Sequence, residues 1–196
     1  MKKTCGAIMV MSMILFIGFG ANTALGKVTE SAFVKMDADG KGVVTVMKYG
    51  AYWKGRFSEI DANKDGKIMA EEFEAATKQA FKDIDTSKDN VLVAQEFVAY
   101  WCGPEAKAPK KAKKKAPKNI DANRDGKIDK DECVVFWMLR FNDMDANKDG
   151  KVTMDEFMAA MKKQFKKLDK NGDGYVTIEE YDFYWSGKQE ASGKGR

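Results

Sequence analysis

The residues best suited to chemistry in this chain are aspartates, asparagines and glutamates that recur at a fixed spacing. The motif Asp-x-Asn-x-Asp-Gly begins at Asp61, Asp121, Asp145 and Asp169. A variant, Asp-Thr-Ser-Lys-Asp-Asn, begins at Asp85, and a degraded copy begins at Asp37. In every copy except the degraded one, a glutamate stands eleven residues after the first aspartate. So many oxygen donors in short segments suit a hard divalent cation.

A 12-residue loop of this kind can surround Ca²⁺ with six to eight oxygens. Side chains at loop positions 1, 3 and 5 point inward, position 7 supplies its backbone carbonyl, and a glutamate at position 12 supplies both carboxylate oxygens. Position 6 needs a residue that tolerates positive φ. The predicted calcium ligands are Asp61, Asn63, Asp65, Lys67 and Glu72; Asp85, Ser87, Asp89, Val91 and Glu96; Asp121, Asn123, Asp125, Lys127 and Glu132; Asp145, Asn147, Asp149, Lys151 and Glu156; and Asp169, Asn171, Asp173, Tyr175 and Glu180.

Two of the six loops depart from this pattern. In loop 85–96, Ser87 still offers an oxygen, and Asn90 at position 6 is a residue type that tolerates the left-handed region. In loop 37–48, Lys41 at position 5 and Lys48 at position 12 replace two anionic ligands. We therefore predict that loop 37–48 binds no calcium and is retained for structure.

On these motifs, the chain resembles the EF-hand calcium-binding superfamily, and most closely the exported multi-EF-hand proteins of bacteria. The resemblance covers about residues 29–186. It implies an all-α fold of helix–loop–helix repeats, with short β-bridges between paired loops and Ca²⁺ as the bound ion. Five regularly spaced loops make this a far more specific signal than a single motif match.

The six loops form two triplets. The loops begin at a constant interval within each triplet, at positions 37, 61 and 85 and again at positions 121, 145 and 169. The second triplet therefore repeats the first at a fixed offset. We predict a first EF-hand triplet in residues 27–103, a linker in 104–118 and a second triplet in 119–196.

Neighbouring loops stand close enough to share one helix. Only 12 residues separate loop 61–72 from loop 85–96, so one helix of about 15 residues, roughly 22 Å long, must leave one loop and enter the next. Successive loops then lie at opposite ends of a shared helix. This arrangement suggests that loop 37–48 pairs with loop 85–96, and loop 121–132 with loop 169–180.

Tryptophan occupies the fifth residue after position 12 in the first and third loops of each triplet. These residues are Trp53, Trp101, Trp137 and Trp185. One interpretation is a ligand groove that calcium opens. The other, which we favour, is a packed core, because aromatic residues at helical spacing usually pack together.

Residues 1–26 have the pattern of a signal peptide. Lys2 and Lys3 precede an apolar run of about 15 residues, which is short for a membrane span. Small residues then predict cleavage near Gly26, with Thr23 as the alternative, and an uncleaved signal anchor is the other interpretation. We predict an exported protein, periplasmic or extracellular, with no transmembrane span in the mature chain.

Cys102 and Cys133 are the two cysteines of the mature chain. In an oxidising compartment they could form a disulfide across the middle of the chain. As reduced residues they would be small apolar side chains on helix faces. The sequence leaves both alternatives open.

The net charge of +4 belongs to the linker. Residues 104–118 carry +6 and contain three prolines, whereas residues 27–103 and 119–196 each carry −2. Such a segment is an extended, solvated spacer or a contact for an anionic surface or protein partner. Nucleic acid is a disfavoured partner, because the protein is predicted to be exported. Pro117 also replaces the phenylalanine that precedes the other loops, so loop 121–132 is predicted to lack its entering helix.

The predicted function is calcium binding by an exported buffer or sensor. The alternative is a calcium-dependent adaptor that binds a protein partner or an anionic surface through its aromatic faces or its linker. We predict no enzyme, because the chain has no histidine and its carboxylates are committed to the loops.

Position 9 is Met69 or Val93 in the first triplet but Asp129, Thr153 or Thr177 in the second. Since polar residues at position 9 can hold calcium through water, the second triplet should bind more tightly.

Overall fold

A computed structural model describes residues 31–109 and 119–186. The predicted signal peptide and part of the predicted linker lie outside these residues. The helices are α1 (Ala32–Met36), α2 (Val46–Ile60), α3 (Ala70–Ile84), α4 (Ala94–Cys102), α5 (Lys130–Met144), α6 (Met154–Leu168) and α7 (Ile178–Ser186). The strands are β1 (Val44–Thr45), β2 (Lys67–Met69), β3 (Val91–Val93), β4 (Lys127–Ile128), β5 (Lys151–Thr153) and β6 (Tyr175–Thr177). No helix among the described residues is long and apolar enough to cross a bilayer.

Four helices of 15 residues each connect one loop to the next, which confirms the prediction of shared helices. Each begins after position 9 of a loop. In α6, for example, Thr153 caps the helix by accepting a hydrogen bond from the Glu156 backbone N–H. Each shared helix ends at the first aspartate of the following loop, as α6 does at Asp169. Loop positions 9 to 12 therefore both close a calcium loop and start the helix that follows it.

The strand pairs join the two halves of the chain, so the predicted pairing within each triplet is wrong. Antiparallel pairs form between β1 and β4, β2 and β6, and β3 and β5. At the centre of two of these pairs, Ile68 faces Val176 and Leu92 faces Val152, and all four side chains are fully buried. Successive loops do lie at opposite ends of the shared helices, as expected, but each loop finds its partner in the other triplet.

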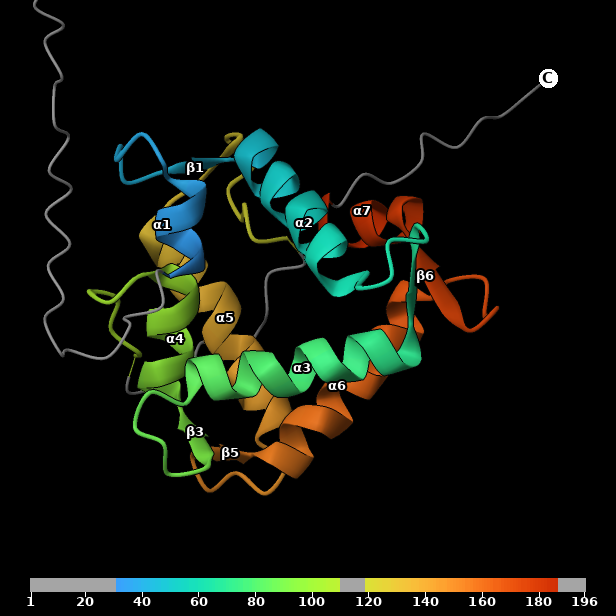
Figure 1. Ribbon diagram of the computed structural model, residues 1–196. Coiled ribbons are helices and arrows are strands. Elements are labelled where there is room, and N and C mark those ends of the chain that lie inside the picture. The colour runs from blue at the N-terminus through green and yellow to red at the C-terminus, as the bar shows by residue number, and fades with distance from the viewer. Residues whose placement is uncertain (1–30, 110–118, 187–196) are drawn as a thin grey trace, which may run out of the picture.

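Helix packing explains why each loop pairs with a loop of the other triplet. The most extensive contacts between helices are those of α4 with α5, α2 with α7, and α3 with α6, and each links the two halves. Figure 1 shows α3 and α6 lying together across the middle of the molecule, with the β3–β5 pair at one end of the assembly. Burying the apolar stripes of α3 and α6 against each other brings loops of opposite halves together.

The core is continuous across both halves, and the tryptophans are part of it. Trp53, Trp137 and Trp185 are buried, and Trp101 is half-buried. Trp53 stacks on Trp185 with ring centroids 3.7 Å apart, and Trp101 stacks on Trp137 at 3.9 Å. Their four indole N–H groups are buried and have no hydrogen-bond partner among the described residues, so ring contacts hold this cluster together. The tryptophans therefore pack as core residues, as the favoured interpretation predicts, and they also border a cavity between the helices.

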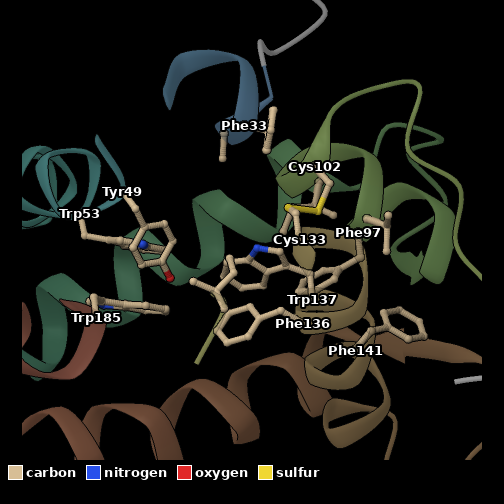
Figure 2. Close-up of a cluster of buried hydrophobic side chains, with 14 of the residues drawn as sticks. Phe33, Tyr49, Trp53, Phe97, Cys102, Cys133, Phe136, Trp137, Phe141 and Trp185 are labelled. Carbon is tan, nitrogen blue, oxygen red and sulfur yellow. A yellow bond between two sulfur atoms is a disulfide. The ribbon is translucent and has the colours of Figure 1, made fainter. Parts of the chain in front are cut away.

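A disulfide joins Cys102 at the end of α4 to Cys133 in α5, with Cα atoms 5.7 Å apart. Figure 2 shows it beside Trp137, between the helices of opposite halves. Both cysteines are almost fully buried. Of the two alternatives that the sequence left open, the structure has the bridge.

Candidate metal centres

Loop 61–72 shows how the five predicted calcium loops are built. The Asp61 carboxylate accepts hydrogen bonds from the backbone N–H groups of Asp65 at 3.1 Å and Gly66 at 2.9 Å. The Asn63 side-chain oxygen accepts from the same Asp65 N–H at 2.8 Å, and Asp65 accepts from the Lys67 N–H at 2.9 Å. These bonds turn the side chains of positions 1, 3 and 5 toward the inside of the loop.

The glutamate at position 12 ties the two ends of the loop together. One oxygen of Glu72 accepts from the N–H groups of Ala62 at 3.0 Å and Asn63 at 3.2 Å, and the other accepts from Met69 at 3.0 Å. The corresponding glutamates of the other four loops bond both loop ends in the same way, and they are Glu96, Glu132, Glu156 and Glu180. The structure thus bonds the predicted carboxylate ligands of each loop to the backbone of that loop.

Loop backbones confirm the conformational part of the prediction. Position 6 has positive φ in every loop, with Gly66 at 84° and Asn90 at 65°. Asn90 therefore performs the turn that glycine performs elsewhere. The lysine side chains at position 7 need not approach the ion, because only their carbonyls are predicted ligands. The Lys67 ammonium lies 3.9 Å from the centre of the Tyr175 ring on the paired strand.

The donor chemistry of these five loops fits a calcium ion. Each loop holds three predicted carboxylate ligands, and none of the fifteen pairs with a lysine or arginine among the described residues. The first aspartate is 5–8% exposed in four of the loops. These carboxylates bond the loops' own N–H groups and do not converge in clusters of three within the described ranges. A divalent cation bound in a loop would supply the counter-charge that the protein does not.

Hydrogen bonds also stabilise the charged form of the closing glutamate in loop 145–156. In Glu156 the backbone N–H and the hydroxyl of Thr153 both donate to the carboxylate, at 3.0 and 2.9 Å. These bonds lower the pKa of Glu156 below its usual value. The carboxylate is therefore kept in the anionic form that binds a metal ion.

Loop 37–48 closes without anionic ligands at positions 5 and 12. Asp37 keeps its bonds to the backbone, accepting from Lys41 at 3.0 Å and Gly42 at 2.7 Å. The Lys48 ammonium bonds the Asp39 carboxylate at 2.6 Å, and Lys41 lies 3.2 Å from the same group. The two lysines lower the pKa of Asp39, with the Lys48 bond as the larger cause. The sequence identified Lys48 as a lost ligand but did not show that its ammonium bonds position 3.

The segment where an entering helix is predicted to be missing lies mostly outside the described residues, before loop 121–132. No helix precedes it in the described residues from 119 onward, but Ile120 is buried and Asp121 keeps both of its backbone bonds. Additional support comes from the degraded loop. Val44 on β1 pairs with Ile128 on β4, and the Val46 N–H donates to the Gly126 carbonyl at 3.2 Å.

Comparison with known families agrees with this description. The sequence model of the EF hand matches residues 54–75, 118–132, 140–162 and 161–182. Each matched stretch contains one of the four loops with an intact Asp-x-Asn-x-Asp-Gly motif, whereas loops 37–48 and 85–96 fall outside them. The chain therefore carries EF-hand units, and its fold is the all-α EF-hand fold that the sequence predicted.

A search among curated proteins finds no significant match. Among solved structures, the crystal structure of caltubin from the great pond snail is similar to this chain at 20% sequence identity. The match covers 65% of this chain and 90% of caltubin, with a TM-score of 0.28. A likeness at this level informs neither the fold nor the function of the chain.

Proposed function

We propose that this protein binds five calcium ions and acts outside the cytoplasm as a calcium buffer or sensor. The observation that carries the proposal is the contrast between the loops. Five of them hold three carboxylate ligands without a protein counter-charge among the described residues, whereas the sixth holds two lysines against one of its aspartates. The predicted signal peptide and the disulfide support an exported, oxidising location.

The strand pairs divide the five proposed sites into three groups. Loop 61–72 pairs with loop 169–180, and loop 85–96 pairs with loop 145–156, so each of these pairs holds two ions. Loop 121–132 pairs with the degraded loop 37–48 and holds one. Because β-bridges connect the loops within a pair, calcium at one loop should favour the other. Extracellular loops of this kind typically bind at about 10⁻⁴–10⁻³ M.

Native mass spectrometry of residues 27–196 in calcium tests the number of sites. Five bound ions are expected, and zero or one would refute the proposal. The variant Asp85→Ala should bind one ion fewer, because it loses the position-1 ligand of loop 85–96. The matched variant Asp37→Ala changes the same position of the degraded loop and should leave the number of ions unchanged.

The alternative function is an adaptor that uses its aromatic faces or its lysine-rich linker. Burial of the tryptophan cluster favours the buffer or sensor, since three of the four rings are less than one-tenth exposed. The described start of the linker lies against α4, where the Gln95 side chain bonds the backbone of Ala106 at 2.7 Å and Ala108 at 3.0 Å. Calcium-dependent exposure of apolar surface, measured with a hydrophobic dye, would favour the adaptor.

A further inference from the structure

A cavity that opens to solvent lies between helices of both halves. Its volume is about 350 Å³, and its walls come from α2, α3, α4, α5, α6 and α7. Sites for small organic ligands begin at about 300 Å³. This space therefore has the size of a ligand site.

The walls are mainly aromatic and apolar. The two stacked tryptophan pairs form one side, and Phe73 of α3 and Phe157 and Met161 of α6 form another. Figure 2 shows the stacked pair Trp53 and Trp185, and the Trp137 ring lies 6.3 Å from that of Trp53. Small side chains on the facing helices, among them Ala80 and Ala160, leave the space open. Such walls fit an apolar or aromatic body.

The charges on the lining are unequal. Four cationic side chains line the cavity against one carboxylate: the cations are Arg56, Arg140, Lys163 and Lys167, and the carboxylate is Asp143. A ligand with an anionic group would complement this excess.

Arg140 is the arginine of this lining that forms no salt bridge among the described residues, although the nearby Asp143 and Tyr184 side chains favour its charged form. Its guanidinium carbon lies 3.4 Å from the centre of the Phe136 ring, and its nitrogen donates to the Phe136 carbonyl at 3.5 Å. Arg56, which stands at the equivalent position of the first triplet, pairs with Glu59. The residue equivalent to Glu59 is Asp143, whose side chain is one methylene shorter, and it forms no ion pair with Arg140 in the described structure. Burial also lowers the pKa of Arg140, which reflects the poor solvation of its charge.

We propose that this cavity binds a small organic anion whose apolar body lies against the tryptophans and whose anionic group pairs with Arg140. A guanidinium donates charge-assisted hydrogen bonds to carboxylate or sulfonate oxygens, and it does so best where water is excluded. The site is separate from the calcium loops, because the ligand uses helix side chains that take no part in them.

Two probes of nearly identical shape test the role of the anion. The sulfonate 8-anilinonaphthalene-1-sulfonate and the neutral N-phenyl-1-naphthylamine share one aromatic body and differ in the sulfonate. Both are titrated into residues 27–196, oxidised and saturated with calcium, and binding is followed by dye fluorescence and by energy transfer from the tryptophans. We expect one site for the sulfonate and an affinity at least about tenfold higher than that of the neutral probe.

Variants then identify the anchor. Asp143→Glu gives Arg140 the counter-ion that Arg56 has, so it should weaken the sulfonate about tenfold and leave the neutral probe within about twofold. Arg140→Gln should do the same. Lys82→Gln removes a positive charge from an exposed position of α3 and should change neither probe.

Filling the space tests the cavity itself. Ala160→Phe on α6, or Ala80→Leu on α3, should abolish binding of both probes. The helical circular dichroism and the number of bound calcium ions show whether each variant is folded, independently of the probes. Three results would each overturn the proposal. The two probes could bind with equal affinity, or Lys82→Gln could weaken the sulfonate as much as Arg140→Gln does. The third is undiminished probe binding by cavity-filling variants that are folded.

Discussion

Reduction of the Cys102–Cys133 disulfide should destabilise the folded protein strongly. The bridge joins residues 31 positions apart, and the enclosed segment contains the linker between the two halves. In the unfolded chain the bridge restricts that segment, whereas in the folded protein the packing of α4 against α5 already holds both ends in place. Breaking the bond therefore restores entropy mainly to the unfolded state.

The magnitude follows from the length of the closed segment. Loop-closure entropy for about 31 residues amounts to about 12 cal/mol/K, which is about 4 kcal/mol at 25 °C. With a urea m-value of about 2 kcal/mol/M, the midpoint of unfolding should fall by about 2 M on reduction. This is a large share of the roughly 5–15 kcal/mol that stabilises a typical domain.

The assay is urea unfolding of residues 27–196 in saturating calcium, oxidised and after reduction with a phosphine. The mass gain of two hydrogens confirms reduction of the buried bridge. The double variant Cys102→Ala, Cys133→Ala is the control, because the phosphine should not change its midpoint. If reduced and oxidised protein unfold at the same urea concentration, the assignment of this stability to the bridge is refuted.

Other predictions concern the calcium loops. The double variant Lys41→Asp, Lys48→Glu should convert loop 37–48 into a sixth site, which native mass spectrometry would register as one additional ion; a count of five would contradict the role given to the lysines. Lys48→Gln should keep five ions but weaken the site in loop 121–132, because the degraded loop loses its Asp39 bond and supports its partner less well. Met69→Thr should tighten loop 61–72 in calorimetric titration, since threonine can cap α3 and hold calcium through water, and an unchanged affinity would count against the importance of position 9.

The local features of this protein could be predicted from its sequence. Residue types at fixed loop positions determine which N–H groups the carboxylates bind and where the chain takes positive φ, so Asp61 and Asn90 behave as expected. The short interval between loops 61–72 and 85–96 requires a helix shared between them, because no room remains for two.

The long-range features could not be predicted, because the repeat itself hides them. Ile68, Leu92, Val152 and Val176 are interchangeable apolar residues at the same loop position, so the sequence pattern cannot specify which of them meet across a strand pair. For the same reason, the sequence could not show whether Cys102 and Cys133 lie close enough to form a disulfide. The bond between Lys48 and Asp39 depends on side-chain reach within a folded loop, which residue type alone does not give.

The strand pairs that cross between halves have the pattern of a symmetric dimer. Exchanging the two halves turns the β2–β6 pair into the β5–β3 pair and maps β1–β4 onto itself. It also turns the Trp53–Trp185 stack into the Trp137–Trp101 stack. This is the self-complementary contact of a two-fold homodimer, formed here within one chain.

This internal two-fold relation has a consequence for each half alone. A single triplet carries both sides of every contact, so the isolated second half, residues 119–186, should self-associate through the surface that it now presents to the first half. The disulfide breaks the relation, because the positions equivalent to Cys102 and Cys133 hold Ser186 and Tyr49. The covalent bridge thus distinguishes the two halves of an otherwise repeated architecture and fixes the pairing of each half with the other.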